Sequence, residues 1–341
     1  MTDLKSMYPA ELEEYFLSIG EPKYRAGQVF ARLSAGDTDF SVMTALPSAL
    51  RTRLSESCAI ARAEIASRLV SKIDGTIKYL FSFSDGEKIE SVLMRYKYGN
   101  TVCISTQAGC RMGCSFCASP LNGFRRNLTA GEMLEQVMAV MRDTGEKVTG
   151  IVLMGIGEPL DNYDNVLRFL RLVNDPAGLN ISHRHISLST CGLVDKIDAL
   201  SREKLQITLS VSLHAPCDEI RRRIMPVAKV YPFDSLMAAC RRYTAATNRR
   251  ISYEYALMSG VNDSDRDAHS LGRLLAGQLC HVNLIPVNEV KERGYKKSTR
   301  ERVNGFAGIL ESYKINTTVR RRLGGDINAS CGQLRAEHTE E

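Results

Sequence analysis

The stretch that decides the fold of this chain is TVCISTQAGCRMGCSFCASPLNGF, residues 101–124, which holds four cysteines within fifteen residues. Cys110, Cys114 and Cys117 follow the spacing C-x3-C-x2-C, and Cys103 precedes them by seven positions. Zinc sites typically use two C-x2-C knuckles and four ligands, and no second knuckle stands near this loop. Thiolates suit zinc or an iron–sulfur cluster, so ligand type leaves both open, but three thiolates fit a [4Fe–4S] cluster with one open iron.

Cysteine usage along the whole chain bears on the redox compartment. Ten cysteines are spread over 341 residues, and the first residues, MTDLKSMYPAELEEYF, lack a basic region followed by an apolar core. This pattern favours reduced thiols with metal or catalytic roles over a secreted disulfide scaffold. No segment approaches the roughly 20 apolar residues of a membrane span. We therefore expect a cytoplasmic protein with no membrane partner.

Basic residues occur in clusters. The formal net charge is only +6, and the hydrophobic fraction of 44% is enough for a sizeable core. Arginines, however, come in runs at 125–126, 221–223, 241–242, 249–250 and 320–322. A single pair is commonly a solvated helix face, but five runs together indicate a polyanion such as nucleic acid. We expect Arg125, Arg126 and Arg320 to Arg322 to contact phosphates.

The chain divides into three parts by pattern. Residues 1–60 predict short helices, in segments such as PAELEEYFLSIG and KYRAGQVFARLSAG that end at glycine, and we assign them to an RNA-binding accessory domain. Residues 61–98 alternate polar and apolar residues around two Asp-Gly turns, which predicts a β-hairpin or meander as a connecting segment. Residues 99–341 then form the main domain.

The main domain alternates strands with helices. Strands are predicted at 101–105, 148–154, 185–189, 207–212, 251–257, 281–286 and 316–320. The helix after the cysteines starts with a capping box, Thr129 and Glu132, and its methionine-rich face is expected to be core. About six βα units imply an α/β fold with a parallel sheet, open or curled as part of a barrel, and an active site at the carboxyl ends of the strands.

The cysteine loop resembles the signature of the radical S-adenosylmethionine (SAM) superfamily, with an aromatic residue, Phe116, before the last cysteine. The resemblance implies a partial (β/α)6 barrel, with the small N-terminal helical and β accessory part beside it, and a [4Fe–4S] cluster on Cys110, Cys114 and Cys117. The open iron of that cluster would bind SAM. Residues at the ends of four predicted strands are then the expected SAM contacts: Gly157, Glu158, Ser189, Ser212, Leu213, His214 and Asn288.

Five longer segments make the resemblance more specific. CISTQAGCRMGCSFCASPLNGFRRNL, GIGEPLDNYDNV, SVSLHAP, RRRIMPVAK and RRRLGGDINASCGQL together resemble the RlmN/Cfr family of RNA adenosine methyltransferases, and the RlmN branch more closely. The resemblance covers nearly the whole chain. It implies methylation of carbon 2 of an adenosine in the peptidyl-transferase region of 23S rRNA, and of the adenosine 3′ to the anticodon in tRNAs.

The resemblance also gives roles to residues outside the cluster. Carbon 2 of adenine is electron-poor and cannot attack the methyl group of SAM, so a radical route is needed. One SAM methylates Cys331; a second is cleaved to a 5′-deoxyadenosyl radical that takes hydrogen from the S-methyl group, and the carbon radical adds to the ring. Glu90 matches the acid that removes the ring proton. Cys103 releases the adduct and leaves a Cys103–Cys331 disulfide, which needs a reductant.

The implied partners are 23S rRNA and tRNA, whose target base must be flipped out, and an external, flavodoxin-like electron donor. We expect a monomer. The remaining cysteines, Cys58, Cys191, Cys217, Cys240 and Cys280, are interpreted as small packing residues. Two alternatives stay open: a Cfr-type enzyme that methylates carbon 8 and confers antibiotic resistance, and, more remotely, a zinc-stabilised RNA-binding protein without catalysis.

Overall fold

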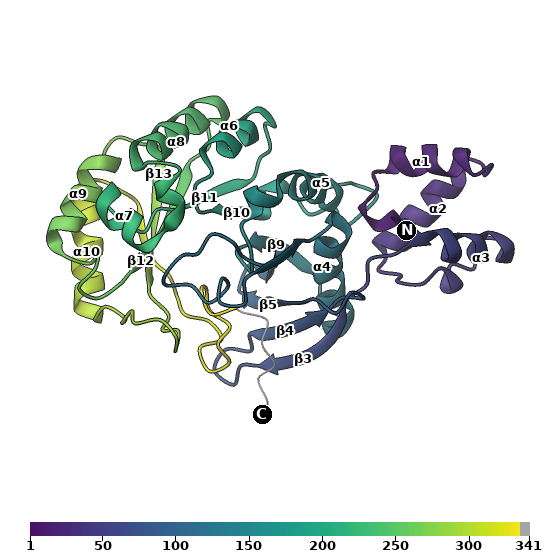
Figure 1. Ribbon diagram of the computed structural model, residues 1–341, viewed down its shortest axis with the longest axis horizontal. Coiled ribbons are helices and arrows are strands. Elements are labelled where there is room, and N and C mark those ends of the chain that lie inside the picture. Colours follow the sequence, from purple (N-terminus) through teal and green to yellow (C-terminus); the bar gives the residue numbers. More distant parts are fainter. Residues whose placement is uncertain (335–341) are drawn as a thin grey trace.

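The computed structural model describes residues 1–334, and it has a small helical lobe beside a larger lobe built on one sheet (Figure 1). In chain order the small lobe contains β1 (Thr2–Asp3), the 3-10 helix η1 (Leu4–Ser6), α1 (Pro9–Ser18), α2 (Tyr24–Ser34), η2 (Phe40–Val42), α3 (Ser48–Ser57) and β2 (Cys58–Ala59). β1 pairs with β2 in parallel, with Thr2 opposite Cys58, so the two ends of the lobe lie side by side.

The large lobe is built on a ten-stranded sheet in the order β14-β13-β12-β11-β10-β9-β6-β5-β4-β3. The strands are β3 (Glu64–Val70), β4 (Ile77–Ser82), β5 (Lys88–Tyr96), β6 (Gly99–Cys103), β9 (Val148–Leu153), β10 (Ile186–Thr190), β11 (Thr208–Ser212), β12 (Ile251–Leu257), β13 (Cys280–Pro286) and β14 (Thr317–Val319). Neighbours from β6 to β14 are parallel, and those from β3 to β6 are antiparallel. Each of the seven strands predicted for the main domain corresponds to one of the parallel strands.

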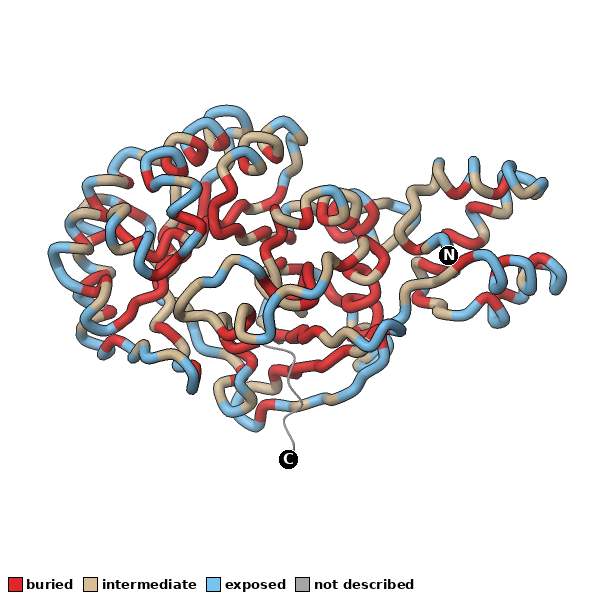
Figure 2. The backbone as a smooth tube through the Cα atoms, in the orientation of Figure 1, coloured by how far each residue is buried: buried red, intermediate tan, exposed pale blue. Residues whose placement is uncertain are grey.

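Helices cover the outside of the parallel strands, as the alternating pattern predicts (Figure 1). They are α4 (Ala130–Thr144), α5 (Tyr163–Val173), α6 (Val194–Arg202), α7 (Asp218–Ile224), α8 (Phe233–Thr247), α9 (Asp265–Leu275) and α10 (Arg300–Ser312), with short 3-10 turns η3 (Pro159–Asn162), η4 (His183–His185) and η5 (Pro226–Lys229). Figure 2 shows that buried residues follow the strands and the inner helix faces. The fold is therefore the predicted α/β partial barrel.

Residues 61–98 do not form a separate connecting segment, because their strands continue the main sheet. The second half of β5, from Val92 to Tyr96, pairs with the whole of β6, with Met94 opposite Thr101. β4 is almost wholly buried, which shows that both of its faces are covered. The sequence pattern correctly indicated a meander here. The sheet continues from β5 to β6 without a break at residue 98, where the sequence placed a domain boundary. The pairing of these two strands leaves no local signal in the sequence.

The small lobe is attached to α4 by buried polar contacts. Lys5 and Glu135 are 4% and 0% exposed, and Lys5 Nζ donates to Glu135 Oε2 at 2.5 Å. Gly131 is required at this junction because a Cβ there would lie 2.4 Å from Asp3 Oδ2. The predicted capping box of α4, Thr129 with Glu132, is present, and its methionine face is buried in the core. Burial of a charged pair is tolerated only when the pair is complete, so this junction holds the two lobes in one arrangement.

Candidate active site

Two adjoining cavities open at the carboxyl ends of the parallel strands. The first cavity, with about 1000 Å³ of free space, is lined by Cys110, Cys114 and Cys117 together with residues that follow β9 to β14. The second cavity, with about 990 Å³, is lined by Cys103, Tyr96 and residues 319–323. Cys331 lines both cavities, so the same residue borders each of them.

The cysteine loop follows β6 and is framed by the short strands β7 (Gln107–Gly109) and β8 (Phe124–Asn127). The Cys110 amide donates to the carbonyl of Gly123 at 3.2 Å, and the Ser115 amide donates to that of Ile224 at 2.9 Å. Burial raises the pKa of the Cys110 thiol to about 12, and it also raises the pKa values of Cys114 and Cys117. Desolvation therefore disfavours the charged thiolate form of these side chains unless a positive charge lies beside them.

The fit of this loop to a cluster rests on how the thiols are placed. All three line the same cavity. Within residues 1–334, no three His, Cys, Asp or Glu side chains are arranged around a point where one metal ion could sit. A cubane takes one thiolate on each of three different irons, so it needs ligands that converge on a cavity without meeting at one point. The three cysteines line one cavity, as the ligands of a single cluster must.

Gly157 and Glu158 lie on the wall of the first cavity, after β9. Gly157 has φ +108°, and a Cβ there would lie 2.7 Å from the Cβ of Gln107, so only glycine fits. Glu158 is 3% exposed and accepts from the amides of Leu160 and Cys191 at 3.0 and 2.7 Å. Burial raises its pKa, and these two amide donors oppose that effect. The carboxyl is thus held rigidly at the strand end, where it can accept from an amino group.

Ser189, Ser212 and His214 also line the first cavity, whereas Leu213 does not. The Leu213 side chain is fully buried in the core, so a contact with SAM by that side chain finds no support in its position. His214 has φ +55° and its Nδ1 accepts from the amide of Ala256 at 2.9 Å. Burial lowers the pKa of His214 to about 3, so the ring stays neutral.

Glu254 is a cavity residue that sequence reasoning missed. It lies within β12, lines the first cavity and is 5% exposed. Asn283 Nδ2 and Ser252 Oγ donate to its carboxyl at 2.7 and 3.1 Å, while burial raises its pKa. The signal was present, since an acid within the apolar run ISYEYAL is costly to bury without a purpose.

The segment that carries Cys331 is fixed to the cavity walls by backbone contacts. Asn288 Nδ2 donates to the Cys331 carbonyl at 3.0 Å, and the Ala118 amide donates to the Gly332 carbonyl at 2.8 Å. Ser119 Oγ donates to the carbonyl of Leu334 at 3.0 Å. Asn288 therefore positions Cys331 as well as lining both cavities, and the cysteine loop and the Cys331 segment form one unit.

Cys103 ends β6 and faces the second cavity beside Arg320. Burial, with a contribution from Cys331, raises the pKa of Cys103 to about 12, and Arg320 acts in the opposite direction. The pKa of Arg320 is itself raised by Cys331 and by Glu254, against the effect of burial. The guanidinium therefore lies near the two thiols and the acid, and Arg320 lines both cavities.

Glu90 is 1% exposed and pairs with Lys78 at 2.6 Å. It lies two residues before Val92, which is opposite Cys103 in the sheet and lines the second cavity. Glu90 itself lines neither cavity. The structure therefore places this acid on the second cavity's side of β5, next to the lining residues rather than among them.

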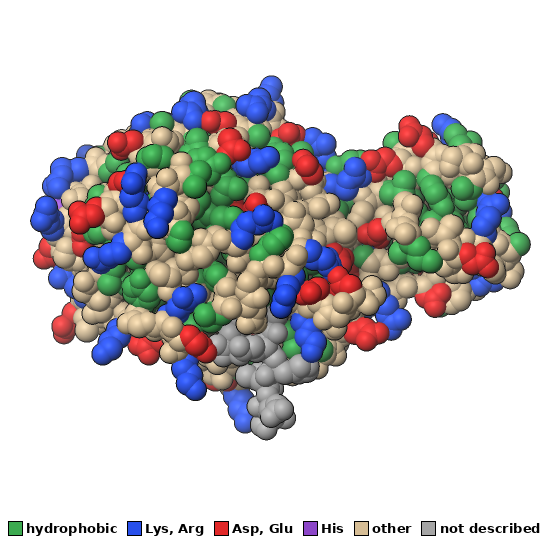
Figure 3. Space-filling view, viewed as in Figure 1, with side chains coloured by type: hydrophobic (Ala, Val, Ile, Leu, Met, Phe, Trp, Pro, Cys, Tyr) green, Lys and Arg blue, Asp and Glu red, His purple; other side chains and the backbone are tan. Residues whose placement is uncertain are grey.

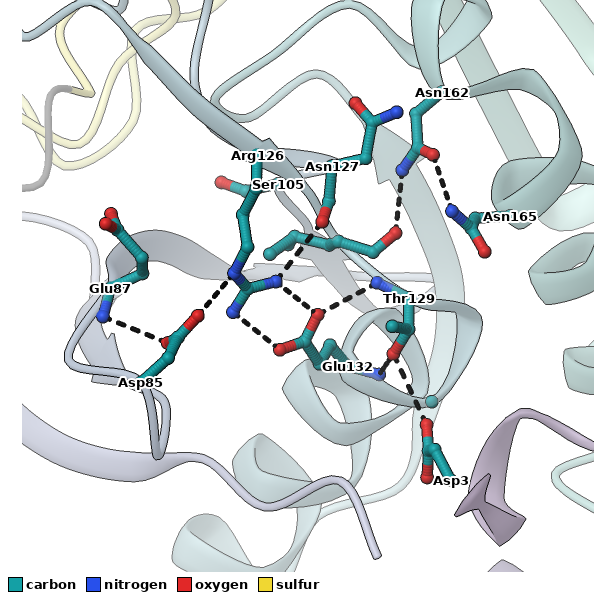
Figure 4. A network of polar contacts seen from close by, with 12 residues as sticks. Asp3, Asp85, Glu87, Ser105, Arg126, Asn127, Thr129, Glu132, Asn162 and Asn165 are labelled. Carbon is teal, nitrogen blue, oxygen red and sulfur yellow. Dashed lines mark hydrogen bonds and ion pairs between the residues drawn. The ribbon is translucent and has the colours of Figure 1, made fainter. Parts of the chain in front are cut away.

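Arg126 is held in a network of carboxylates. Its guanidinium bonds to Asp85 and to both carboxyl oxygens of Glu132, which also caps α4 (Figure 4). Arg125, in contrast, is exposed. Exposed Lys297, Arg321 and Arg322 surround the second cavity. Lys and Arg are otherwise scattered over the face seen in Figure 3, so the sequence runs alone did not show which cations gather at the site.

An aromatic pair borders the second cavity. Tyr96 lines it and stacks on Tyr98, with ring centroids 5.0 Å apart and an interplanar angle of 5°. Tyr98 is 80% exposed. Among the cysteines interpreted as packing residues, Cys58, Cys191 and Cys240 are buried in the core, and Cys191 also lines the first cavity.

Comparison with known proteins gives matches along nearly the whole chain. Residues 104–271 match the radical SAM superfamily, and residues 2–60 match the ribosomal RNA large subunit methyltransferase N-terminal domain. A protein of Alkaliphilus oremlandii described as a probable dual-specificity RNA methyltransferase RlmN is 53% identical over 99% of this chain and 98% of its own length. One of Thermoanaerobacter sp. with the same description is 51% identical over the full length of both chains.

A solved structure gives the same result for the fold. The crystal structure of a radical SAM methyltransferase from Sphaerobacter thermophilus superposes with a TM-score of 0.95, at 46% identity, over 99% of this chain and 100% of that one. Within the described residues 1–334, no helix combines the length and apolar composition needed to cross a membrane.

Proposed function

Because the chain belongs to the RlmN family of radical SAM RNA methyltransferases, we propose that it methylates carbon 2 of an adenosine in 23S rRNA and of the adenosine 3′ to the anticodon in tRNAs. A [4Fe–4S] cluster and SAM are the cofactors of this class of enzyme. We assign the cluster to Cys110, Cys114 and Cys117. The observation that carries the proposal is the place of Cys331 on the wall of both cavities.

The two cavities divide the reaction between them. The first would hold the cluster and SAM, whose chemistry when bound is to provide a methyl group and to abstract hydrogen. Gly157, Glu158, Ser189, Ser212 and Asn288 would bind and orient SAM there, and the neutral His214 adds a polar lining without an extra charge. The second cavity would take the flipped adenine, since it opens between exposed cations and an aromatic pair.

Cys331 would connect the two cavities as the carrier of the one-carbon unit. Its thiol accepts a methyl group on the side of the first cavity, and the same carbon joins the adenine ring on the side of the second. Cys103 then attacks the sulfur of the Cys331 thioether, and a Cys103–Cys331 disulfide forms as the carbon–sulfur bond breaks. The bonding electron pair leaves with the carbon attached to the adenine ring, which takes up a proton to become the methyl group. An external reductant returns both thiols, and a separate electron donor, of flavodoxin type, serves the cluster.

We keep Glu90 as the proposed acceptor of the ring proton, although its pairing with Lys78 has to open for that role. Its place on the same side of β5 as Val92, which lines the second cavity, supports the assignment. Leu213 is left out of the proposed SAM contacts made by side chains. An enzyme with these substrates would work in the cytoplasm, and we propose that it acts as a monomer.

Mass spectrometry of nucleosides from modified RNA tests the regiochemistry. We expect 2-methyladenosine in 23S rRNA and tRNA from cells that depend on this enzyme. A product methylated at carbon 8 would assign the Cfr-type activity instead. Membership of a radical SAM enzyme family removes the remote alternative of a zinc-stabilised protein without catalysis.

Phosphate contacts at the second cavity predict a steep salt dependence of RNA binding. Each cation that contacts a phosphate releases counterions, so log affinity should fall linearly with log salt. We expect Arg321→Gln and Arg322→Gln each to lower the slope by about 1. Arg250→Gln is the matched control, since Arg250 is exposed but precedes β12, at the opposite end of the strands. Equal slopes for all three variants would exclude the second cavity's cations from RNA binding.

A further inference from the structure

Arg221 is a buried cation that the reaction described above does not use. It lies on α7 and is 0% exposed, the largest side chain that is fully buried among the described residues. Its neighbours on the helix, Arg222 and Arg223, are exposed. The sequence run RRR at 221–223 therefore contains one residue in a quite different environment from the other two.

The guanidinium of Arg221 has few partners. Its Nη2 donates to the carbonyls of Cys191 and Ser212, at 2.5 and 3.3 Å. Its Nε and Nη1 are buried without any hydrogen-bond partner in the described part of the chain. Asp218, on the same helix, pairs with Arg222 instead. Arg221 thus keeps a full positive charge inside the protein, and no carboxylate of residues 1–334 forms an ion pair with it, although Asp218 favours the charge from a distance.

Such a charge is costly unless something compensates it. An ion moved out of water into a protein interior loses solvation, and backbone carbonyls recover only part of that loss. Burial accordingly lowers the pKa of Arg221, and the groups that act most strongly in the opposite direction are Cys191 and Cys114. A guanidinium nevertheless stays protonated under all ordinary conditions. The interior around α7 therefore calls for a negative charge that the chain itself does not supply.

The position of α7 shows where that charge would be. The helix ends at Ile224, whose carbonyl accepts from the amide of Ser115 at 2.9 Å and from its hydroxyl at 3.1 Å. Ser115 stands next to Cys114 in the cysteine loop. Arg221 itself lines neither cavity, so its charge lies behind the wall that Cys191 and Ser212 form. It is too enclosed to bind SAM or RNA directly.

We propose that Arg221 is the counter-charge of the iron–sulfur cluster, a positioning residue that acts on the cluster's reduction potential through space. The inference rests on the proposed assignment of the cluster to Cys110, Cys114 and Cys117. A cluster with three thiolate ligands carries net negative charge, and one-electron reduction by the external donor adds another. Net charge and surroundings set the potential of such clusters. A fixed cation beside Cys114 stabilises the reduced form and raises the potential.

The test compares a neutral and a charged replacement. We expect Arg221→Gln to bind the cluster and to have a more negative midpoint potential, by at least a tenfold change in the reduction equilibrium, which equals about 59 mV for one electron. Arg221→Lys should remain close to the unaltered protein because it keeps the charge. Arg222→Gln is the matched control, since Arg222 is the exposed neighbour on the same helix. The potential is measured by anaerobic redox titration followed by electron paramagnetic resonance.

A second measurement, the unfolding temperature of the apoprotein, tests whether the role of Arg221 is purely structural. Without cluster, Arg221→Gln should unfold at the same or a higher temperature than the unaltered apoprotein, because an uncompensated buried charge has been removed. A lower temperature would mean that the bonds to Cys191 and Ser212 are what matters, and it would overturn the inference. So would equal potentials for the Gln and Lys variants.

Failure of the proposed cluster site would look different from failure of this inference. If Cys114→Ala kept a full complement of iron and sulfide, the cluster would be bound elsewhere, and any effect of Arg221 on it would need another cause. If Cys114→Ala lost the cluster while Arg221→Gln left the potential unchanged, the site would stand and the counter-charge role would fall.

Discussion

Cys103→Ala purified from cells is expected to carry covalently attached RNA. Cys331 can still be methylated in this variant and its carbon can still join the adenine ring, but the thiol that would break the carbon–sulfur bond is missing. A denaturing gel should show a slower band that disappears on treatment with ribonuclease. The effect is close to all-or-none, since no other cysteine of the described chain lines the second cavity besides Cys103 and Cys331.

Two companion variants separate the roles of these cysteines. Cys331→Ala has no carrier for the one-carbon unit, so its RNA should remain unmodified and its gel should show a single band. The double variant Cys103→Ala/Cys331→Ala should behave like Cys331→Ala. A ribonuclease-sensitive band with Cys331→Ala would reverse the two assignments, and normal turnover by Cys103→Ala would remove that residue from the reaction.

Loss of any one cysteine of the triad is expected to abolish cluster binding and SAM cleavage. In Cys110→Ala, Cys114→Ala or Cys117→Ala, one iron has no protein ligand, and the cavity offers no other thiolate of the same loop to replace it. Iron and sulfide analysis after anaerobic reconstitution, with the visible spectrum, measures the loss directly and does not depend on RNA.

Cys280→Ala is the matched control for the triad. Cys280 starts β13, at the end of the strand away from the cavities, and lines neither of them. This variant should keep the cluster content and the SAM cleavage of the unaltered protein. Full iron content and activity in Cys114→Ala would show that the loop is not the cluster site.

Local pattern was enough to predict most of the fold. The run ISYEYAL at 251–257 appears as β12 with the same bounds. All seven of its residues are buried, as expected for a strand of a parallel sheet that is covered on both faces. The cap at Thr129 and the buried methionines of α4 followed equally from short-range rules. The pairing of β5 with β6 could not be predicted in this way, since it depends on which distant strand lies alongside.

Some residues of the candidate site were predicted from the sequence, and the environments of others were not. Cys110, Cys114, Cys117, Glu158 and Asn288 lie on the first cavity as expected, because strand ends and loop spacing are visible in the sequence. The arginines were the weak point. Arg126, Arg221 and Arg320 stand in similar basic runs, yet their environments differ. Arg126 pairs with the carboxylates of Asp85 and Glu132, and Arg221 is buried behind the cavity wall. Arg320 lies near the thiols of Cys103 and Cys331. Charge is visible in a sequence, but solvent exposure of a long side chain is decided by tertiary packing.

The attachment of the Cys331 segment has a consequence for how the molecule is made. Chains leave the ribosome in order, and their earlier parts fold first. The cysteine loop follows the fourth strand of the large sheet, whereas Cys331 comes after the last one, β14, and its neighbours Gly332 and Leu334 bond to Ala118 and Ser119. Every nascent chain therefore passes through a stage in which the loop is present and its cover is not. Under the proposed cluster assignment, iron and sulfide would meet an uncovered loop at that stage, before the segment that carries Cys331 packs against Ala118 and Ser119.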